Sequence, residues 1–314
     1  CNEIPVKILF ICSNLIGDTI LSSGVINYFV DQNKDAKLTF VVGQTAAPLL
    51  KNYKNIENII VFQKRKFNLH WFEIFQKTFK TKWDIVVDFR SSAISYLLRN
   101  NKKYIFKKHQ NIHHIEQLNS SFGFNCSNLF IPISDDEKNK ANYDLDKSFI
   151  HIVIFPGGNW SPKVWSSDNF NAIMKLLLNK YNNIKFILVG SLEEKNKFYN
   201  KLIKGIKEEL IIDLFGYNLT LTSAYMQKSN IFIGNDSGLM HLAVANKLRV
   251  ISLFGPTNDK IYGPYGSDDI VIRTEESLDH FHSLKIDENK SYMNSIKPET
   301  VLQTCEKIID DNFN

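Results

Sequence analysis

Short apolar runs alternate with amphipathic stretches along almost the whole chain. Residues 6–12 have the length and apolar content of a buried parallel strand, and helical spacing of apolar positions follows from Ile20 to Val30. The first half continues with expected strands at 38–42, 59–62, 84–87 and 103–106 and expected helices at 46–50, 69–79 and 92–98. Such alternation predicts a parallel sheet with helices on both faces.

A second series of the same kind follows a polar, charged stretch from Pro132 to Lys147, which is the best domain boundary in the sequence. Its expected strands lie at 149–155, 184–189, 210–212, 231–233, 250–254 and near 269–272, and its expected helices at 168–180, 192–204, 220–228 and from Leu239 onward. Pro298 is expected to begin a C-terminal helix, with the option that this helix packs back on the first domain. The sequence therefore predicts two Rossmann-like, doubly wound α/β domains, at residues 1–147 and 148–314, that face a central cleft.

Composition narrows the class of protein. With 314 residues, 44% hydrophobic and 23% charged, the chain is typical of a globular protein, and neither a membrane-spanning run nor a signal sequence is evident, so we expect an intracellular protein. Its net charge of +5 is concentrated in basic patches at 64–66 and 102–109, which suit an anionic acceptor or the anionic face of a membrane. No nucleic-acid module accompanies this charge. The cysteines are too far apart to predict a zinc site or a disulfide framework; they are Cys1, Cys12, Cys126 and Cys305.

Polar and glycine-containing turns follow many of the expected strands. Because ligands bind beyond the carboxyl ends of parallel strands, these turns are the candidate ligand site. They lie at 13–18, 156–163, 190–194, 218–220 and 235–238.

The last of these turns belongs to the stretch that organises the chain, residues 229–258, SNIFIGNDSGLMHLAVANKLRVISLFGPTN. A strand meets a helix there, and the free N–H groups and positive dipole end of a helix start suit phosphate. Asp236 could cap this helix or accept hydrogen bonds from a sugar hydroxyl. For an isolated NDSG sequence, plain capping would be the preferred interpretation.

The longer pattern, GNDSGLMHLAVA followed by LFGPTN and GPYG, closely resembles the donor-binding signature of the lipopolysaccharide heptosyltransferases, glycosyltransferase family 9. The resemblance covers roughly residues 6–62 and 150–310. It implies a GT-B type fold and an inverting, metal-independent glycosyltransferase without a cofactor. Such an enzyme moves a heptose from ADP-L-glycero-D-manno-heptose to a lipopolysaccharide core or related surface glycan. The resemblance also implies an acceptor-binding first domain, a donor-binding second domain and a cytoplasmic location, with peripheral contact at the inner membrane.

Particular residues match the family's motifs. Asp18, in SNLIGDTILSSGVI, matches the proposed general base, whereas its alternative role is to cap the helix that follows. Asn14, in the same turn, and Arg90, in DFRSS, are expected to bind an acidic acceptor, although Arg90 could instead pair with Asp88.

The other matches lie in the expected donor domain. Lys163, in FPGGNWSPKVW, should hold the donor diphosphate, although Val164 replaces the family's commoner arginine. One of Glu193 and Glu194, with Glu193 preferred, is expected to contact the ribose, and Thr220 to cap a helix and touch the donor. The remaining expected donor residues are Asp236, Ser237, Gly238 and His241.

Other classes of function find less support. The pairs His113–His114 and His280–His282 lack well-placed acidic partners, and Asp144-Leu-Asp146 lies in the linker, so no metal site is expected. A dinucleotide oxidoreductase would have G-x-G-x-x-G after the first strand, which is absent. A family member that uses a different nucleotide sugar, and a noncatalytic nucleotide-sugar-binding protein, remain as alternatives.

Overall fold

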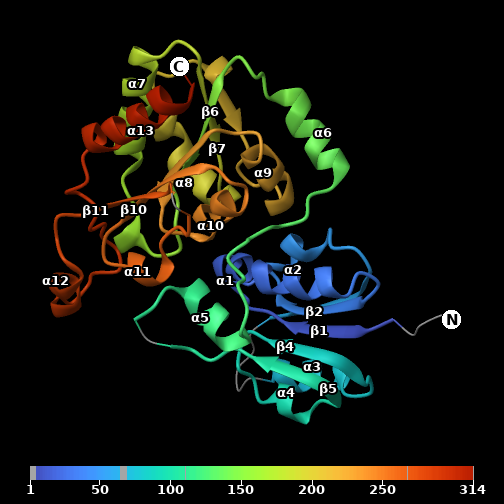
Figure 1. The fold of residues 1–314 in the computed structure, drawn as a ribbon. Helices are drawn as coiled ribbons and strands as arrows, with labels where there is room; N and C mark the ends of the chain where they lie inside the picture. Colours follow the sequence, from blue (N-terminus) through green and yellow to red (C-terminus); the bar gives the residue numbers. More distant parts are fainter. Residues whose placement is uncertain (1–4, 64–68, 110, 267, 314) are drawn as a thin grey trace. The chain divides into compact units, whose positions relative to one another are not determined.

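The computed structural model describes residues 5–63, 69–109, 111–266 and 268–313. Cys1 and the basic patch at 64–66 fall outside this range. The chain divides into two compact units between Pro132 and Ile133 (Figure 1). Each unit is a parallel sheet with helices, which confirms the predicted fold class.

The first unit contains a five-stranded sheet in the order β3-β2-β1-β4-β5, and every pair is parallel. Its strands are β1 (Lys7–Ile11), β2 (Lys37–Gly43), β3 (Ile56–Phe62), β4 (Trp83–Asp88) and β5 (Asn100–Ile105). Its helices are α1 (Ile16–Leu21), α2 (Ser23–Gln32), α3 (His70–Thr78), α4 (Ile94–Leu97) and α5 (His114–Phe122), with a short turn of 3-10 helix at Ala47–Leu50. Because β1 is central, Phe10 pairs in register with Phe40 on one side and Val87 on the other.

Both faces of this sheet are covered by apolar side chains. On one face Ile74 of α3, Ile94 of α4 and Leu98, which follows α4, join a core that includes Leu9 and Ile11. On the other face α2 packs Phe29 edge-on against Phe10, which stacks on Phe40. A strand that is buried on both faces consists almost entirely of apolar residues. For this reason the sequence KILFI predicted β1 clearly.

The second unit contains a six-stranded parallel sheet in the order β11-β10-β9-β6-β7-β8. Its strands are β6 (Ile150–Phe155), β7 (Ile184–Leu188), β8 (Ile211–Asp213), β9 (Ile231–Asn235), β10 (Arg249–Phe254) and β11 (Ile270–Arg273). Its helices are α6 (Asp135–Asp144), α7 (Ser167–Lys180), α8 (Leu192–Leu202), α9 (Leu219–Met226), α10 (Gly238–Ala245), α11 (Asp259–Tyr262), α12 (Leu278–Ser283) and α13 (Pro298–Phe313). Further 3-10 turns lie at Ser161–Lys163 and Glu208–Leu210.

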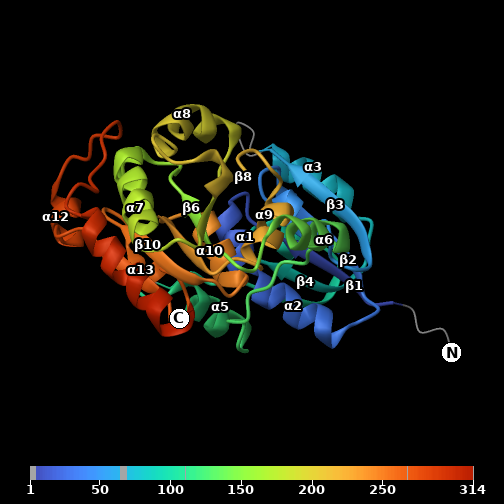
Figure 2. The same ribbon diagram turned by 90° about the horizontal axis from the view of Figure 1, so that it is seen from above.

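The C-terminal helix belongs to this second unit. The apolar face of α13, including Val301, Cys305 and Ile309, is buried in the same core as α7 and α8. Figure 2 shows α13 running beside α7. The apolar face of α13 is therefore used for packing within the second unit.

The boundary between the units falls earlier than the predicted division at 147/148. The polar stretch that was interpreted as a linker forms α6, which lies along α9 of the second unit (Figure 1). Tyr225 of α9 donates a hydrogen bond to Asp144 at the end of α6. The stretch has almost no apolar periodicity, since only Ala141 of α6 is buried, so its helical state was not evident from the hydrophobic pattern.

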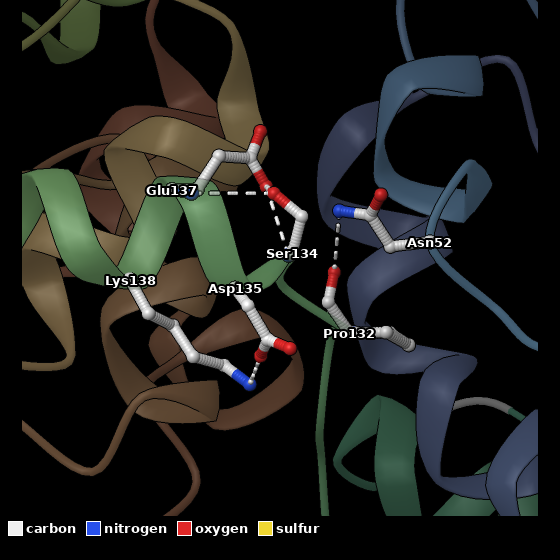
Figure 3. A network of polar contacts seen from close by, with 6 residues as sticks. All are labelled: Asn52, Pro132, Ser134, Asp135, Glu137 and Lys138. Carbon is white, nitrogen blue, oxygen red and sulfur yellow. Dashed lines mark hydrogen bonds and ion pairs between the residues drawn. The ribbon is translucent and has the colours of Figure 1, made fainter.

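A capping box fixes the start of α6. Ser134 accepts a hydrogen bond from the Glu137 amide at 3.3 Å, and Glu137 accepts one from the Ser134 amide at 3.0 Å (Figure 3). Just before it, the Pro132 carbonyl accepts a bond of 3.3 Å from the Asn52 amide group, which ties the end of the first unit to its own body. The S-x-x-E signature was therefore the available sequence signal for this helix.

Within the described ranges, no helix is both long and apolar enough to cross a membrane. Three cysteines of the described chain, Cys12, Cys126 and Cys305, are buried free thiols.

Candidate functional site

In the first unit the strand order reverses between β1 and β4. At such a switch point the loops that follow the two strands diverge, which leaves a crevice for ligands. The loop after β1 carries Asn14 and leads into α1, which holds Asp18, and the loop after β4 carries Arg90. Gly43, at the end of β2, lets the first loop approach closely, because a Cβ there would lie 2.4 Å from the Asn14 Cα.

Asp18 lies inside the first turn of α1 rather than before the helix. The helix begins at Ile16 and its N-terminal cap position is Leu15, without a side-chain cap, so the alternative capping role of Asp18 is wrong. The Ser13 hydroxyl donates to Asp18 Oδ2 at 3.0 Å. Asp18 is half-buried, so its carboxylate is oriented by the protein and still partly open to solvent.

His114, at the start of α5, belongs to the surroundings of Asp18. Burial lowers the pKa of the His114 imidazole, while the negative charge of Asp18 acts in the opposite direction. His113, which caps α5 by accepting a bond from the Ile115 amide, and Lys108 lower this pKa further. The sequence analysis treated the histidine pair only as a poor metal site and missed this proximity, which depends on how α5 folds back within the unit.

Arg90 is held by contacts that the sequence analysis did not foresee. Its guanidinium donates to the Asn14 side-chain oxygen at 3.2 Å and lies over the rings of Trp71 and Phe62, with centroid distances of 5.7 and 6.0 Å. Ser91 follows in the left-handed region, with φ of 50°, an uncommon conformation for a residue with a side chain.

The alternative ion pair between Arg90 and Asp88 is not what the structure shows. The Asp88 carboxylate is fully buried and accepts from the Arg90 amide, the Ser92 amide and the Ser92 hydroxyl, each at 2.7 Å. Asp88 therefore shapes the loop, and the guanidinium is directed toward Asn14. Two residues predicted separately as acceptor contacts thus lie together.

In the second unit the strand order reverses between β6 and β9. The loop after β6 leads to Lys163 and the turn after β9 begins at Asp236. Lys163 Nζ lies 3.1 Å from Asp236 Oδ2, and both side chains are nearly buried, with 12% and 10% exposed. Two predicted donor residues therefore form an ion pair at the switch point of this sheet.

Ser237, not Asp236, caps α10. The Ser237 hydroxyl accepts a hydrogen bond from the Met240 amide at 3.2 Å, which leaves the Asp236 carboxylate to Lys163. Gly238 is the first residue of the helix, and His241 is buried within it. The start of α10 therefore lies next to a lysine ammonium, an arrangement that suits an anion.

Asn235 organises the glycine turn at residues 156–158. Its fully buried amide donates to the carbonyl oxygens of Pro156 and Gly157 at 3.2 and 2.9 Å, and its side-chain oxygen accepts from the Trp165 amide at 3.0 Å. The sequence analysis placed Asn235 in the turn without giving it a role. Its position at the last residue of β9 was the available signal.

Glu193 and Glu194, at the start of α8, have different surroundings. Glu194 completes a capping box with Ser191 and also accepts from the Gly158 amide at 2.9 Å, whereas Glu193 is exposed. Glu194 thus supports the glycine turn, and a ribose contact by Glu193 stays a prediction.

Thr220 is fully buried, and it does not cap α9 as expected. The cap is Asn218, whose side chain accepts from the Leu221 amide at 2.8 Å. The Thr220 hydroxyl donates to Glu137 of α6 at 2.5 Å and lies 2.9 Å from Asn218 Oδ1. A contact between Thr220 and a donor stays a prediction.

Arg273, at the end of β11, was missed. Its guanidinium donates to the carbonyl oxygens of Gly255 and Thr257 at 2.6 and 2.9 Å and pairs with Asp259 at 2.6 Å. It therefore fixes the GPTN turn at the edge of the sheet where Asp236 lies. A lone arginine at a strand end carries no signal for this role, since its targets are backbone carbonyls.

Within the described part of the chain, no group of three or more His, Cys, Asp or Glu is placed to hold a metal ion. Both acids of the Asp-x-Asp sequence have other partners: Asp144 pairs with Lys140 at 2.9 Å and accepts from Tyr225, and Asp146 accepts from Ser148.

Comparisons with known proteins give the family and the fold. The family model described as glycosyltransferase family 9 (heptosyltransferase) matches residues 74–291. The chain is 22% identical over 327 aligned positions to lipooligosaccharide heptosyltransferase 2 of Campylobacter jejuni, covering 98% of this chain and 99% of that protein.

Solved structures show the same fold. A family 9 glycosyltransferase from Veillonella parvula matches with a TM-score of 0.76 and 22% identity over 98% of both chains. Escherichia coli heptosyltransferase WaaC with ADP-2-deoxy-2-fluoro heptose matches with a TM-score of 0.70 and 17% identity, over 96% of this chain and 99% of that one.

Proposed function

Because the chain belongs to glycosyltransferase family 9 and is therefore a glycosyltransferase, we propose that it transfers heptose from ADP-L-glycero-D-manno-heptose. The proposed acceptor is a lipopolysaccharide core or a related surface glycan. The curated relative is named for transfer to lipooligosaccharide, and the E. coli enzyme was solved with an ADP-heptose analogue. These names support the choice of donor and acceptor.

The observation that carries the proposal is the Lys163–Asp236 pair beside the start of α10. In our proposal the donor diphosphate binds there. It accepts hydrogen bonds from the first backbone amides of the helix and is attracted by the positive charge of Lys163. Asp236 keeps the Lys163 ammonium in position before the donor arrives. As the sugar–phosphate bond breaks, the negative charge that grows on the leaving diphosphate is offset by Lys163 and the helix end.

The second half of the proposal concerns Asp18. The acceptor oxygen attacks the anomeric carbon from the face opposite the diphosphate, so that a new carbon–oxygen bond forms as the old one breaks and the configuration inverts. ADP leaves with the bonding electrons, and the hydroxyl proton passes to the Asp18 carboxylate. The Ser13 hydroxyl, at 3.0 Å, holds one oxygen of this carboxylate and leaves the other for the proton.

Arg90 and Asn14 are proposed to hold an acidic group of the acceptor. Contact with two aromatic rings limits the movement of the guanidinium, whose planar fork can make two parallel hydrogen bonds to a carboxylate or phosphate. The reaction is proposed to need no metal, since Lys163 and the helix start supply the positive charge. It is proposed to take place on the cytoplasmic side of the inner membrane, with the enzyme in peripheral contact.

Thermal unfolding with nucleotides tests the donor site. We would measure the shift in Tm caused by ADP, UDP, GDP and CDP in the presence of EDTA. A ligand at a hundred times its Kd stabilises the folded protein by about 2.7 kcal/mol. We expect a shift with ADP in the wild type and its loss in Lys163→Met. Lys228→Met, at an exposed lysine after α9, is the matched control and should respond like the wild type.

Transfer itself is then measured with ADP-heptose and a purified heptose-deficient core oligosaccharide, and the stereochemistry of the product is determined. Preference for another nucleotide would assign a different sugar donor. A shift that requires added divalent metal would overturn metal independence. Binding without transfer to any core oligosaccharide would favour the noncatalytic alternative.

A further inference from the structure

Four large apolar side chains project from one helical layer of the first unit. They are Phe72 and Phe79, at α3 and its end, and Tyr96 and Leu97 of α4, with 62%, 39%, 64% and 65% of their surfaces exposed. We call this surface the α3–α4 face. Because α3 and α4 contribute to the same core, these residues share the outer side of one layer, drawn in cyan in Figure 1.

The exposure is not explained by an incomplete core. Ile74, Ile94 and Leu98 of this layer are buried, and Trp71 and Phe75 pack partly buried against the same core. The layer has thus satisfied its inner side and still presents aromatic and aliphatic side chains outward. Clustered exposed apolar residues of this size mark a surface that meets another apolar phase or molecule.

The segment of the chain that carries these residues is rich in positive charge. Between residues 69 and 109 there are nine Lys or Arg and three Asp or Glu, and one of those acids, Asp88, is fully buried. Lys103 Nζ lies 4.1 Å from the Tyr96 ring centroid and Lys80 Nζ lies 5.9 Å from that of Phe79. Long lysine side chains beside exposed rings can leave those rings in an apolar phase while the ammonium groups reach anionic headgroups.

We propose that the α3–α4 face docks on a membrane surface rich in anionic lipid. Phe72, Tyr96 and Leu97 enter the boundary between headgroups and acyl chains, and the surrounding lysines contact lipid phosphates. An apolar cluster with lysines at two of its rings fits an anionic lipid surface. This inference gives the proposed peripheral contact a defined surface, and in that respect it rests on the proposed function.

The docking surface adjoins the candidate acceptor residue. Trp71, the neighbour of Phe72 in α3, is one of the two rings beneath the Arg90 guanidinium. Insertion of Phe72 would therefore place the headgroup layer next to Arg90. A lipid-linked acceptor could then present its anionic groups to Arg90 without leaving the membrane.

Flotation of the purified full-length protein with vesicles tests the proposal. Vesicles of phosphatidylethanolamine with phosphatidylglycerol provide the anionic surface, and vesicles of phosphatidylcholine alone provide the neutral one. We expect binding to the anionic vesicles that weakens with salt, and a fall of roughly tenfold or more in the double variant Phe72→Ser/Leu97→Ser. The matched control is Leu192→Ser, which changes an equally exposed leucine in the second unit and should bind as the wild type does.

Unchanged vesicle binding by the double variant, with an unchanged Tm, would overturn the assignment of this face. Equal binding to neutral vesicles would overturn the role of the lysines. A change from dimer to monomer in the double variant, with no vesicle binding by the wild type, would replace the membrane by a second copy of the chain. Nucleotide-induced Tm shifts and transfer to a soluble core oligosaccharide should be unaffected in the double variant, so failure here is distinguishable from failure of the proposed function.

Discussion

Arg90 Nη1 lies 3.2 Å from the side-chain oxygen of Asn14, although 76 positions separate the two residues. They follow β4 and β1, where the order of the first sheet reverses. In the second unit Lys163 and Asp236, 73 positions apart, meet at 3.1 Å where the order of that sheet reverses. Each unit thus brings one cation and one oxygen partner to its switch point.

For Arg90, the informative change is Arg90→Lys. Lysine keeps the charge but loses the planar fork and its contacts with the Trp71 and Phe62 rings, so the KM for an acidic acceptor should rise about tenfold. Steady-state kinetics with the core acceptor measure this, and nucleotide-induced Tm shifts should stay unchanged. Arg99→Lys, at an exposed arginine, is the control. An unaltered KM would remove Arg90 from acceptor binding.

Asp18→Asn should lower kcat by a factor of about 10²–10⁴, because the amide cannot accept the acceptor proton. Ser13→Ala, which removes only the 3.0 Å hydrogen bond to the carboxylate, should have a smaller effect. Both are measured in single-turnover transfer assays with saturating donor. Activity of Asp18→Asn close to that of the wild type, with intact nucleotide binding, would exclude Asp18 as the base.

Gly157 is predicted to tolerate no side chain while Glu194 is present. A Cβ at Gly157 would lie 1.9 Å from Glu194 Oε1, so Gly157→Ala should destabilise the protein by about 1–3 kcal/mol. Chemical denaturation measures this loss. In the double variant Gly157→Ala/Glu194→Ala the obstruction is gone. The loss of stability in the double variant should therefore be smaller than the sum of the losses in the two single variants. Strictly additive losses would mean that the two residues do not collide.

Thr220→Val separates a structural role from a donor contact. The hydroxyl donates to Glu137, so its removal should lower stability by about 1 kcal/mol and leave the Tm shift with ADP unchanged. Ser134→Ala removes the N-terminal cap of α6, the helix that holds Glu137, and should lower stability by a similar amount. Reduced nucleotide binding by Thr220→Val at unchanged stability would favour the donor contact instead.

His151, in β6, should make stability depend on pH. Burial lowers its pKa, Lys185 lowers it further, and Asp146 opposes them. The unfolded chain, with a histidine pKa of about 6.5, then binds the proton first, so stability is present above that pH and is lost as the pH falls below it.

His151→Leu should therefore reduce the fall in Tm between pH 7.5 and 5.5. It should cost little at pH 7.5, because His151 Nε2 is buried without a hydrogen-bond partner among the described residues. The exposed His282→Gln is the control, and part of the fall should persist because burial lowers the His114 pKa in the same direction. A Tm profile identical to that of the wild type would contradict a role for His151.

The elements that the sequence predicted best are those with the strongest burial. Apolar runs such as 6–12 and 149–155 match β1 and β6 closely, since strands covered on both faces can hold few polar residues. Prediction from the apolar pattern failed where polar side chains determine the structure. The residues of α6 carry no apolar stripe, and only the Ser134–Glu137 capping box indicates a helix.

Caps at the candidate sites were also uncertain from sequence. Asp18, Asp236 and Thr220 each stand where a capping residue is common, yet none of them caps a helix. A shift of one to three residues in the start of a helix moves the capping position to another residue. That shift depends on packing rather than on the local preference of an aspartate or threonine.

By itself, then, the sequence determined the alternation of strands and helices, the polar turns at the strand ends and the motif that resembles family 9, because apolar periodicity and turn chemistry are local properties. The tertiary structure decided which turns meet. Asn14 with Arg90, and Lys163 with Asp236, come together only because each sheet reverses its strand order at that point. Strand order is set by the packing of whole elements, and no local pattern of residues encodes it.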